Sequence, residues 1–591
     1  MKAGLFAFGA LVVAVPAAAQ PVGDPLAPLP TTAPPAQQPP AIAVPQAAQV
    51  QAPAPVPTVA IPRDWRGVFD AIDAGNWASA QAGIATLPPS ILAPVARAEL
   101  YTAKGSPVVD LASIQALIAQ APELPQANQL ALMALKRGAT TPPLIIAEKP
   151  TMLLGSAPVR YRAKPVQGEP TADQLRTQLD GLVKVNDAAG AEALLVSQGP
   201  YLSTEARAEA ATRVAFAYYV LGLDMDARRV AETWRQGATG EWASQAAWVS
   251  GLASWRLNDF NAASASFQQV ARLADQRELR AGGYYWAARS EQAAGRPRSV
   301  EGLLRAAANT YEAPESFYGL LARETLGMST KLAPDSLTGS DPPVAQLPNV
   351  QRAIELARIG EPARAEEMIR HQALIGAPTE HHALVQLAKR LELPAAQLWL
   401  AKYGQYGARV DATDRYPNPR WTPLTGWRVD PALAFAHIVQ ESSFRRTAVS
   451  GAGAVGLMQV VPGTASDEAR ARGISYSRAT LTDPRYNLEF GQSFIERMRS
   501  SANTGGQLPK VIASYNAGPT PLGRWASIND KGDPLLWMES LSYWETRYYV
   551  PAVLRNMWVY QGLNNQDTPT LRSMAEHRWP SFPTGMTRLS H

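Results

Sequence analysis

Residues 430–459 read DPALAFAHIVQESSFRRTAVSGAGAVGLMQ, and this stretch is the most informative part of the chain. Its first half has the pattern of an amphipathic helix, with Asp430 as the N-cap residue and Pro431 in the first turn. The apolar pattern continues to Val439, so the helix is expected to end near Glu441. The second half is rich in glycine, which permits tight turns and close approach of the backbone to a neighbour. We predict a helix followed by a compact glycine-rich loop.

The carboxyl group of Glu441 has a special position at the end of this predicted helix. The C-terminus of a helix carries partial negative charge, which disfavours a carboxylate and raises its pKa. A raised pKa is what a general acid near neutral pH requires. A glutamate at a helix end is more often an ordinary surface residue, so this feature alone does not establish catalysis.

Three further short motifs follow the Glu441-Ser442 pair: residues 456–459 read GLMQ, 515–518 read YNAG and 545–550 read ETRYYV. In this order the four motifs resemble those of the soluble lytic murein transglycosylase family. Any one of them alone would be a weak signal, but the ordered set is specific. Small departures are Val460-Val461 after the second motif and Ser514 before the third, and neither is expected to change the mechanism.

The resemblance implies a lysozyme-like catalytic domain, similar to goose-type lysozyme. It assigns Glu441 as the sole catalytic carboxylate. It also implies substrate-binding residues that line a cleft, with Glu545 in a supporting network; these are Ser450, Met458, Gln459, Asn487, Tyr515, Asn516 and Glu545. The nearest acidic residues downstream of Glu441 and its loop, Asp467 and Glu468, are expected on an exposed stretch.

The implied reaction is cleavage of the bond between N-acetylmuramic acid and N-acetylglucosamine in peptidoglycan strands. Glycosidases ordinarily use two carboxylates, whereas here Glu441 would act first as acid and then as base. It would activate the C6 hydroxyl of the same sugar, so that a 1,6-anhydro ring closes. Two alternatives stay open: a hydrolytic muramidase that uses water, and a catalytically silent wall-binding scaffold.

The region from residue 64 to about 335 has helical periodicity without strand alternation. Three segments in it resemble one another, and their turn residues Gly222, Asn258 and Gly295 lie 36 and then 37 residues apart. This period is typical of tetratricopeptide-like solenoids, in which each repeat is one helical hairpin. We expect residues 64–400 to be almost wholly helical and to curve into an arc or ring.

The predicted fold class is therefore all-α: an N-terminal α-superhelical solenoid followed by a C-terminal lysozyme-like domain. We predict a signal peptide at 1–19, a proline-rich linker at 20–62 and a solenoid at 63–340. A small helical linker domain is expected at 341–412, the catalytic domain at 413–575 and a tail at 576–591.

The N-terminus has the pattern of a secretory signal peptide: Met1-Lys2, an apolar run and a small-residue site that ends at Ala19. An uncleaved membrane anchor is the alternative. Residues 20–62 contain 13 prolines and one charged residue, Asp24, which favours an extended linker over a proline-motif ligand. These features predict an exported periplasmic protein without a membrane span after signal removal.

Composition narrows the remaining function classes. The chain has 591 residues, a net charge of +5 and no cysteine, so disulfides, lipidated cysteines and thiolate metal sites are excluded. The mild charge includes no basic run that would mark a nucleic-acid site. Neither metal nor cofactor is expected, because His437 lacks a second histidine at ligand spacing and His381-His382 point apart on a helix. His437 is expected to be packed or hydrogen-bonded. The expected partners are peptidoglycan strands and possible cell-wall synthesis proteins.

Overall fold

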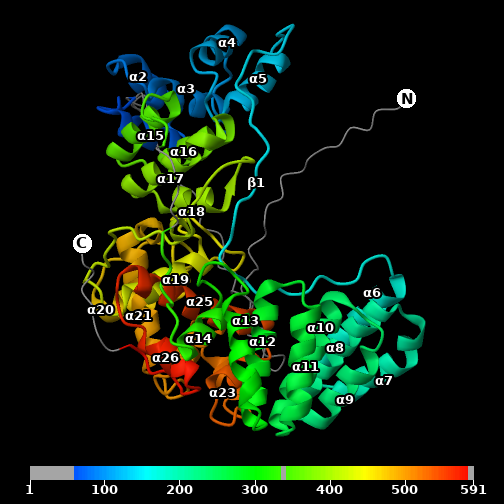
Figure 1. The fold of residues 1–591 in the computed structure, drawn as a ribbon. Coiled ribbons are helices and arrows are strands. Elements are labelled where there is room, and N and C mark those ends of the chain that lie inside the picture. Colours follow the sequence, from blue (N-terminus) through cyan, green and yellow to red (C-terminus); the bar gives the residue numbers. More distant parts are fainter. Residues whose placement is uncertain (1–58, 335–340, 584–591) are drawn as a thin grey trace, which may run out of the picture. The chain divides into compact units, whose positions relative to one another are not determined.

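The computed structural model describes residues 59–334 and 341–583. These residues are mainly helical (Figure 1). The paired strands in this part of the chain are β1 (Met152–Leu153) and β2 (Tyr403–Gly404), which run antiparallel. The predicted all-α class is confirmed. No helix among the described residues has the length and apolar character to cross a membrane.

The chain forms two compact units, each of which contains separate stretches of sequence. Within the described residues, the smaller unit comprises 59–149 together with 344–375. Its core includes a buried ion pair, in which Arg352 donates to Glu123 at 2.6 Å. Its helices are α1 (Trp65–Asp73), α2 (Trp77–Thr86), α3 (Ala93–Thr102), α4 (Leu111–Gln120), α5 (Ala127–Lys136), α15 (Pro348–Arg358) and α16 (Pro362–Ile375).

Within the described residues, the larger unit comprises 150–334, 341–343 and 376–583, and its first part is a stack of helical hairpins. Helices α8, α10 and α12 begin at Thr204, Gly240 and Arg277, which are 36 and 37 residues apart. The predicted recurrence is therefore confirmed. The bounds are α6 (Pro170–Lys184), α7 (Ala188–Gln198), α8 (Thr204–Val220), α9 (Asp224–Trp234), α10 (Gly240–Arg256), α11 (Phe260–Leu273), α12 (Arg277–Ala293), α13 (Val300–Ala308) and α14 (Phe317–Thr325).

The hairpin turns follow from local sequence. Gly222, Asn258 and Gly295 all adopt positive φ, at 78°, 61° and 74°. Glycine and asparagine tolerate this left-handed conformation, which ends a helix and lets the chain reverse. The hairpins then pack through large aromatic side chains, and Trp248 and Phe267 meet edge to face with centroids 5.4 Å apart. Spacing and turn chemistry together determine this part of the fold.

After α17 (His381–Arg390) and α18 (Pro394–Lys402), the C-terminal part of the larger unit contains eight named helices within the described residues. Proline occupies the first position of several of them, where its missing N–H costs nothing. The helices are α19 (Pro431–Glu441), α20 (Pro462–Arg472), α21 (Pro484–Arg499), α22 (Leu508–Ala517), α23 (Thr520–Trp525), α24 (Pro534–Glu539), α25 (Trp544–Leu563) and α26 (Pro569–Ala575).

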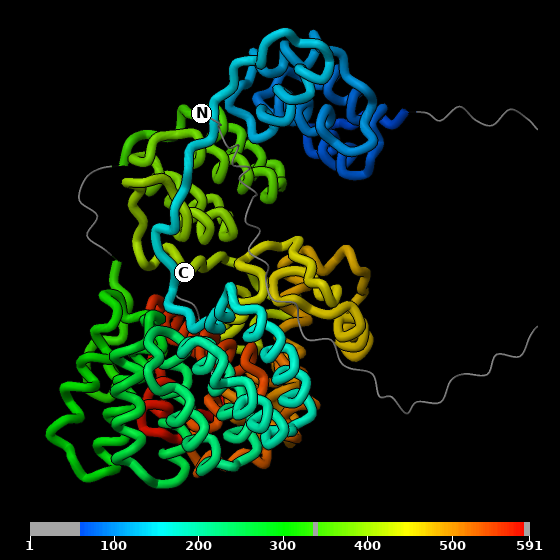
Figure 2. The backbone as a smooth tube through the Cα atoms, turned by 90° about the vertical axis from the view of Figure 1, so that its right-hand side faces the viewer, coloured from blue at the N-terminus to red at the C-terminus, as the bar shows by residue number. Residues whose placement is uncertain are grey.

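The C-terminal helices pack directly on the solenoid: α25 and α26 both contact α14, and in both views the red C-terminal segment lies beside the green solenoid helices (Figures 1 and 2). Glu539 lies in this interface and is 2 % exposed. It accepts hydrogen bonds from Arg160 at 2.8 Å, Tyr318 at 2.7 Å and Trp248 at 3.2 Å. A buried carboxylate with a cation and two further donors is well compensated. The end of α24, which leads into α25, is thereby held against the solenoid.

The domain boundaries stay predictions, with one difference to report. The chain leaves the larger unit after residue 343, close to the predicted boundary at 340, but it also changes unit at residues 149/150 and 375/376. The single solenoid expected at 63–340 therefore draws on both units. The predicted signal peptide, almost all of the linker and the end of the tail lie outside the described residues.

Candidate active site

Helix α19 presents Glu441 as its last residue, as the sequence predicted. Asp430 caps the helix by accepting a hydrogen bond from the backbone N–H of Ala432 at 2.9 Å. Immediately after Glu441 the chain turns sharply, because Ser443 and Phe444 have φ of 50° and 65°. Non-glycine residues rarely adopt this conformation, and such residues cluster at functional sites.

The carboxyl group of Glu441 is held by Tyr549, which comes from the long helix α25. The Tyr549 hydroxyl donates to Oε1 of Glu441 at 2.5 Å. The same hydroxyl lies 2.7 Å from Nδ1 of His437, one turn earlier on α19. His437 is 1 % exposed, and its ring centroid lies 4.4 Å from that of Tyr515 on α22. Three helices therefore converge on Glu441, and the expectation that His437 is packed or hydrogen-bonded is confirmed.

The surroundings of Glu441 favour its protonated form. Burial raises its pKa to about 7, the nearby charge of Glu545 acts in the same direction, and the hydrogen bond from Tyr549 opposes both. Part of the residue still reaches solvent. A partly accessible carboxylic acid that carries its proton up to neutral pH can protonate a leaving group.

A second carboxyl group, that of Glu545, lies in the first turn of α25. Burial raises its pKa, while a hydrogen bond with Asn516 opposes this effect. Asn516 is also fixed by Thr546, whose hydroxyl donates to Oδ1 of Asn516 at 2.7 Å. The YNAG and ETRYYV motifs are thus connected through side chains, and the role of this network in supporting Glu441 stays a prediction.

The backbone of the glycine-rich loop is held in place by hydrogen bonds to the side chain of Asn487 on α21. The Asn487 amide donates to the carbonyls of Val455 and Leu481, both at 2.9 Å, and accepts from the N–H of Met458 at 2.7 Å. Asn487 and Met458 are both 0 % exposed. The structure places these two predicted substrate-binding residues beneath the surface, where they support the loop.

Two glycines make this fit possible. Gly456 has φ of +81°, and a Cβ atom there would lie 2.3 Å from the amide nitrogen of Asn487. A Cβ atom on Gly491 of α21 would lie 2.2 Å from the sulfur of Met458. Tyr515 also contributes, since its hydroxyl donates to the Met458 carbonyl at 2.7 Å. The close approach of loop and helix therefore requires glycine at both positions.

Ser450 and Gln459 lie in the loop itself and remain partly exposed. The Ser450 hydroxyl accepts from the N–H of Ala454 at 3.0 Å. The Gln459 amide donates to the carbonyl of Gly456 at 2.8 Å, and its backbone has φ of 46°. Contact of these two residues with substrate stays a prediction.

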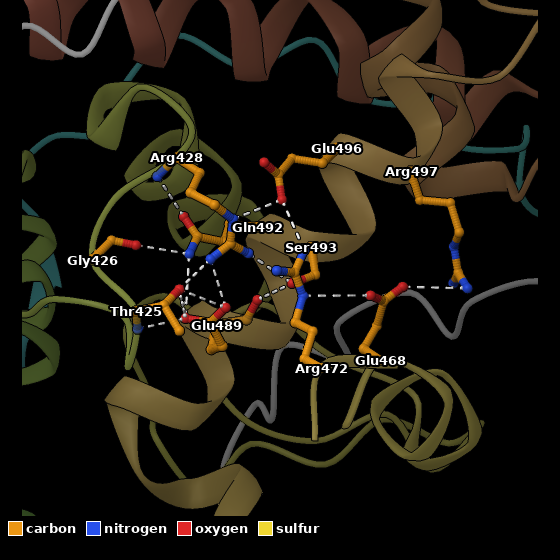
Figure 3. Close-up of polar contacts among 10 residues, drawn as sticks. All are labelled: Thr425, Gly426, Arg428, Glu468, Arg472, Glu489, Gln492, Ser493, Glu496 and Arg497. Atoms are coloured by element: carbon orange, nitrogen blue, oxygen red, sulfur yellow. Dashed lines mark hydrogen bonds and ion pairs between the residues drawn. The ribbon is translucent and has the colours of Figure 1, made fainter. Parts of the chain in front are cut away.

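A charged network stabilises the side of this domain formed by α20 and α21 (Figure 3). Arg428 bridges Glu489 at 2.7 Å and Glu496 at 2.9 Å. The Glu489 side chain is 0 % exposed and also accepts from the N–H and hydroxyl of Thr425. Arg472 joins the network through Glu496 at 3.1 Å. These contacts tie the segment before α19 to α21.

The expectation for Glu468 was wrong in one respect. Asp467 is exposed as predicted, but Glu468 is only 8 % exposed and pairs with Arg497 at 3.3 Å (Figure 3). The physical reason is helical geometry, since successive residues of α20 point in different directions and only Glu468 turns toward α21. Both residues lie outside the contacts around Glu441.

Tyr549 is the residue in contact with Glu441 that the sequence analysis did not single out. It belongs to the ETRYYV motif, yet no role was assigned to it. The usable signal was its spacing: four residues after Glu545 on one helix, which places both side chains on the same face. Its partner across the site, Glu441, could only be identified in three dimensions.

Comparison with known proteins identifies the region of the chain that contains Glu441 and the glycine-rich loop. The sequence model described as "Transglycosylase SLT domain" matches residues 423–537. The soluble lytic murein transglycosylase of Escherichia coli K12 is 34% identical over 156 residues, which cover 26% of this chain and 24% of that protein. The membrane-bound lytic murein transglycosylase C of Yersinia enterocolitica is 38% identical over 98 residues, 15% of this chain and 27% of that protein. The chain thus aligns with these curated relatives over about a quarter of their length.

Solved structures extend the likeness to the whole fold. The crystal structure of the 70-kDa soluble lytic transglycosylase of Escherichia coli superposes with a TM-score of 0.51 at 17% identity, covering 88% of this chain and 98% of that one. The complex of a 70-kDa soluble lytic transglycosylase with bulgecin A gives a TM-score of 0.55 over the same shares. Residues 423–537 thus match the transglycosylase SLT domain, and the chain has the fold of these solved soluble lytic transglycosylases.

Proposed function

We propose that this protein is a lytic transglycosylase that cleaves the β-1,4 bond between N-acetylmuramic acid and N-acetylglucosamine in peptidoglycan. The observation that carries the proposal is the environment of Glu441: a carboxyl group with a pKa of about 7, held by Tyr549 at the end of α19. The family supports it, since curated relatives are named lytic murein transglycosylases.

Glu441 has two roles in the proposed reaction. As an acid it gives its proton to the glycosidic oxygen as the C1–O bond breaks, and the sugar's acetamido oxygen stabilises the positive charge at C1. As a base it then removes the proton of the C6 hydroxyl, which attacks C1 and closes the 1,6-anhydro ring. An intramolecular nucleophile held in place can replace water, because effective molarities reach on the order of 10⁵ M. Glu441 ends the cycle protonated again.

Digestion of purified sacculi followed by mass spectrometry tests this proposal. Muropeptides that end in 1,6-anhydro-N-acetylmuramic acid are expected, each one water lighter than the hydrolysis product. Glu441→Gln should reduce turnover by at least about 10³- to 10⁴-fold, at the upper end of general acid–base catalysis. Asp467→Asn is the matched control, because Asp467 is exposed on α20, and it should keep most of the activity.

Two other outcomes point to the alternatives. Reducing ends in place of anhydro ends would identify a hydrolytic muramidase, for which Glu545 is the second carboxyl group near Glu441. Binding to sacculi without product from the wild-type protein would identify a wall-binding scaffold. A solved Pseudomonas aeruginosa lytic transglycosylase is described as an inactive glutamate-to-glutamine mutant, which supports the catalytic reading.

The site of action is proposed to be the periplasm. Residues 1–19 have the pattern of a signal peptide and the chain lacks cysteine, so no lipid anchor can be attached through that residue. N-terminal sequencing of the exported protein should find Gln20 at or near its start. Extraction only with detergent, with Met1 retained, would contradict this. Peptidoglycan strands are the proposed binding partner, and cell-wall synthesis proteins are proposed as further partners.

A further inference from the structure

His437 is a buried titratable residue that the proposed reaction does not use. It lies on α19 one turn before Glu441 and is 1 % exposed. Burial lowers its pKa to about 3, so its imidazole is neutral in the working range of the enzyme. A neutral imidazole has one N–H donor and one acceptor, and the hydrogen bonds around it decide which nitrogen carries the proton.

The Tyr549 hydroxyl lies between two partners and has a single proton. It is 2.5 Å from Oε1 of Glu441 and 2.7 Å from Nδ1 of His437. If that proton is donated to Glu441, the contact with His437 is a hydrogen bond only when Nδ1 carries a proton. If Nδ1 is bare, the Tyr549 proton is drawn toward His437 instead and Oε1 of Glu441 loses its donor.

We propose that His437 is a positioning residue: its Nδ1–H donates to Tyr549 and so fixes the Tyr549 hydroxyl as a donor to Oε1 of Glu441. This inference rests on the proposed role of Glu441 as the acid. With Oε1 occupied as an acceptor, the transferable proton of Glu441 is held on Oε2. We call this hydrogen-bonded chain from His437 through Tyr549 to Glu441 the relay. It selects which oxygen of the Glu441 carboxyl group faces the bond to be cleaved, and it transfers no proton itself.

The same relay sets the proton affinity of Glu441. The hydrogen bond from Tyr549 stabilises the carboxylate, and an incoming donor at the Tyr549 oxygen polarises its O–H and strengthens that bond. The titratable groups that surround Glu441 in this arrangement are His437 on α19, Tyr515 on α22, and Glu545 and Tyr549 on α25. Loss of the His437 donor should therefore favour the protonated form of Glu441.

The first test is independent of activity. Nitrogen NMR of the full-length wild-type protein, with ¹⁵N-labelled histidine, reports which imidazole nitrogen carries the proton. At pH 7 we expect His437 to be neutral, with a protonated Nδ1 and a bare Nε2. The opposite tautomer would overturn the proposal, whatever the protein's activity.

The second test uses pH–rate profiles on sacculi. His437→Phe keeps a flat ring against Tyr515 but removes the donor, so kcat should fall on the order of tenfold, as for the loss of one buried hydrogen bond. The alkaline limb of the profile should move to higher pH, while KM stays unchanged. His437→Asn retains an amide N–H in about the position of Nδ1 and should recover much of the rate.

The double variant separates positioning from packing. If His437 acts through Tyr549, then adding His437→Phe to Tyr549→Phe should cause no further shift of the alkaline limb, because directly coupled residues are not additive. An unshifted limb in His437→Phe, or full additivity in the double variant, would refute the relay. A wild-type protein without anhydro products, or an active Glu441→Gln variant, would instead refute the proposed function.

Discussion

Replacing Glu441 with glutamine should stabilise the protein at alkaline pH as well as abolish its activity. The raised pKa of Glu441 means that the folded state holds a proton that the unfolded chain releases. Its pKa is about 7 in the folded protein against an ordinary 4.5, and at ~1.4 kcal/mol per pKa unit this corresponds to about 3 kcal/mol. Glutamine is neutral at all pH values, and its amide oxygen can still accept from Tyr549.

The direction of the effect follows from proton linkage. Below pH 4.5 Glu441 is protonated in both states, so wild type and Glu441→Gln should have the same stability. As the pH rises from 4.5 to about 7, unfolding of the wild type releases a proton and its stability falls relative to the variant. Above pH 7 the difference should reach its full value, and Glu441→Gln should be more stable by up to about 3 kcal/mol.

Urea unfolding at pH 4.5, 6, 7 and 8.5 measures this difference. Glu312→Gln is a suitable control, because Glu312 is exposed in the loop between α13 and α14, and its curve should follow the wild type at every pH. A difference between Glu441→Gln and wild type that does not change with pH would refute the reasoning. So would a variant that is less stable than wild type at pH 8.5, since the cost of ionising Glu441 would then be absent.

Three further substitutions test the support of the site. Gly456→Ala requires a side chain at φ of +81° and 2.3 Å from Asn487, so thermal unfolding should show a loss well above 1 kcal/mol and turnover should fall with the displaced loop. Glu489→Gln leaves Arg428 without its buried partner and should destabilise by roughly 3 kcal/mol at pH 7. Burial raises the pKa of Glu489, but hydrogen bonds from the Thr425 N–H and from Arg428 lower it by more, so the folded-state pKa lies below the unfolded one. The stabilisation is therefore present above the unfolded pKa and is lost as pH falls through the folded one, and the difference between Glu489→Gln and wild type should shrink in acid. Glu539→Gln weakens the attachment of α24 to the solenoid and should lower the melting temperature. The alkaline limb of the pH–rate profile should stay in place; a shifted limb would show that this contact affects Glu441.

The helical class and the hairpin repeat could be predicted from the sequence because they depend on local rules. Turn residues with positive φ, such as Gly222 and Asn258, recur at the spacing of one helical hairpin. Asp430 and Pro431 similarly identify the start of α19 without reference to any other part of the chain. The exchange of segments between the two units could not be predicted, because it depends on which distant apolar faces pack together.

Glu441 could be selected from the sequence as the candidate acid because helix position and motif order both point to it. The roles of its neighbours depended on tertiary structure: Asn487 and Met458 were expected to bind substrate, yet both side chains are fully buried. Sequence spacing does not say whether an amide points outward to a ligand or inward to a backbone carbonyl.

The sequence by itself determined the class of fold, the repeat and the position of the proposed catalytic carboxyl group, since these follow from periodicity, caps and local motifs. Tertiary structure alone decided the protonation of that group. Tyr549 and Glu545 lie about a hundred residues beyond Glu441, and they affect its pKa only because α25 packs against α19. Burial and hydrogen bonding act through space, so the chemistry of the site is set by residues that the order of the chain keeps far apart.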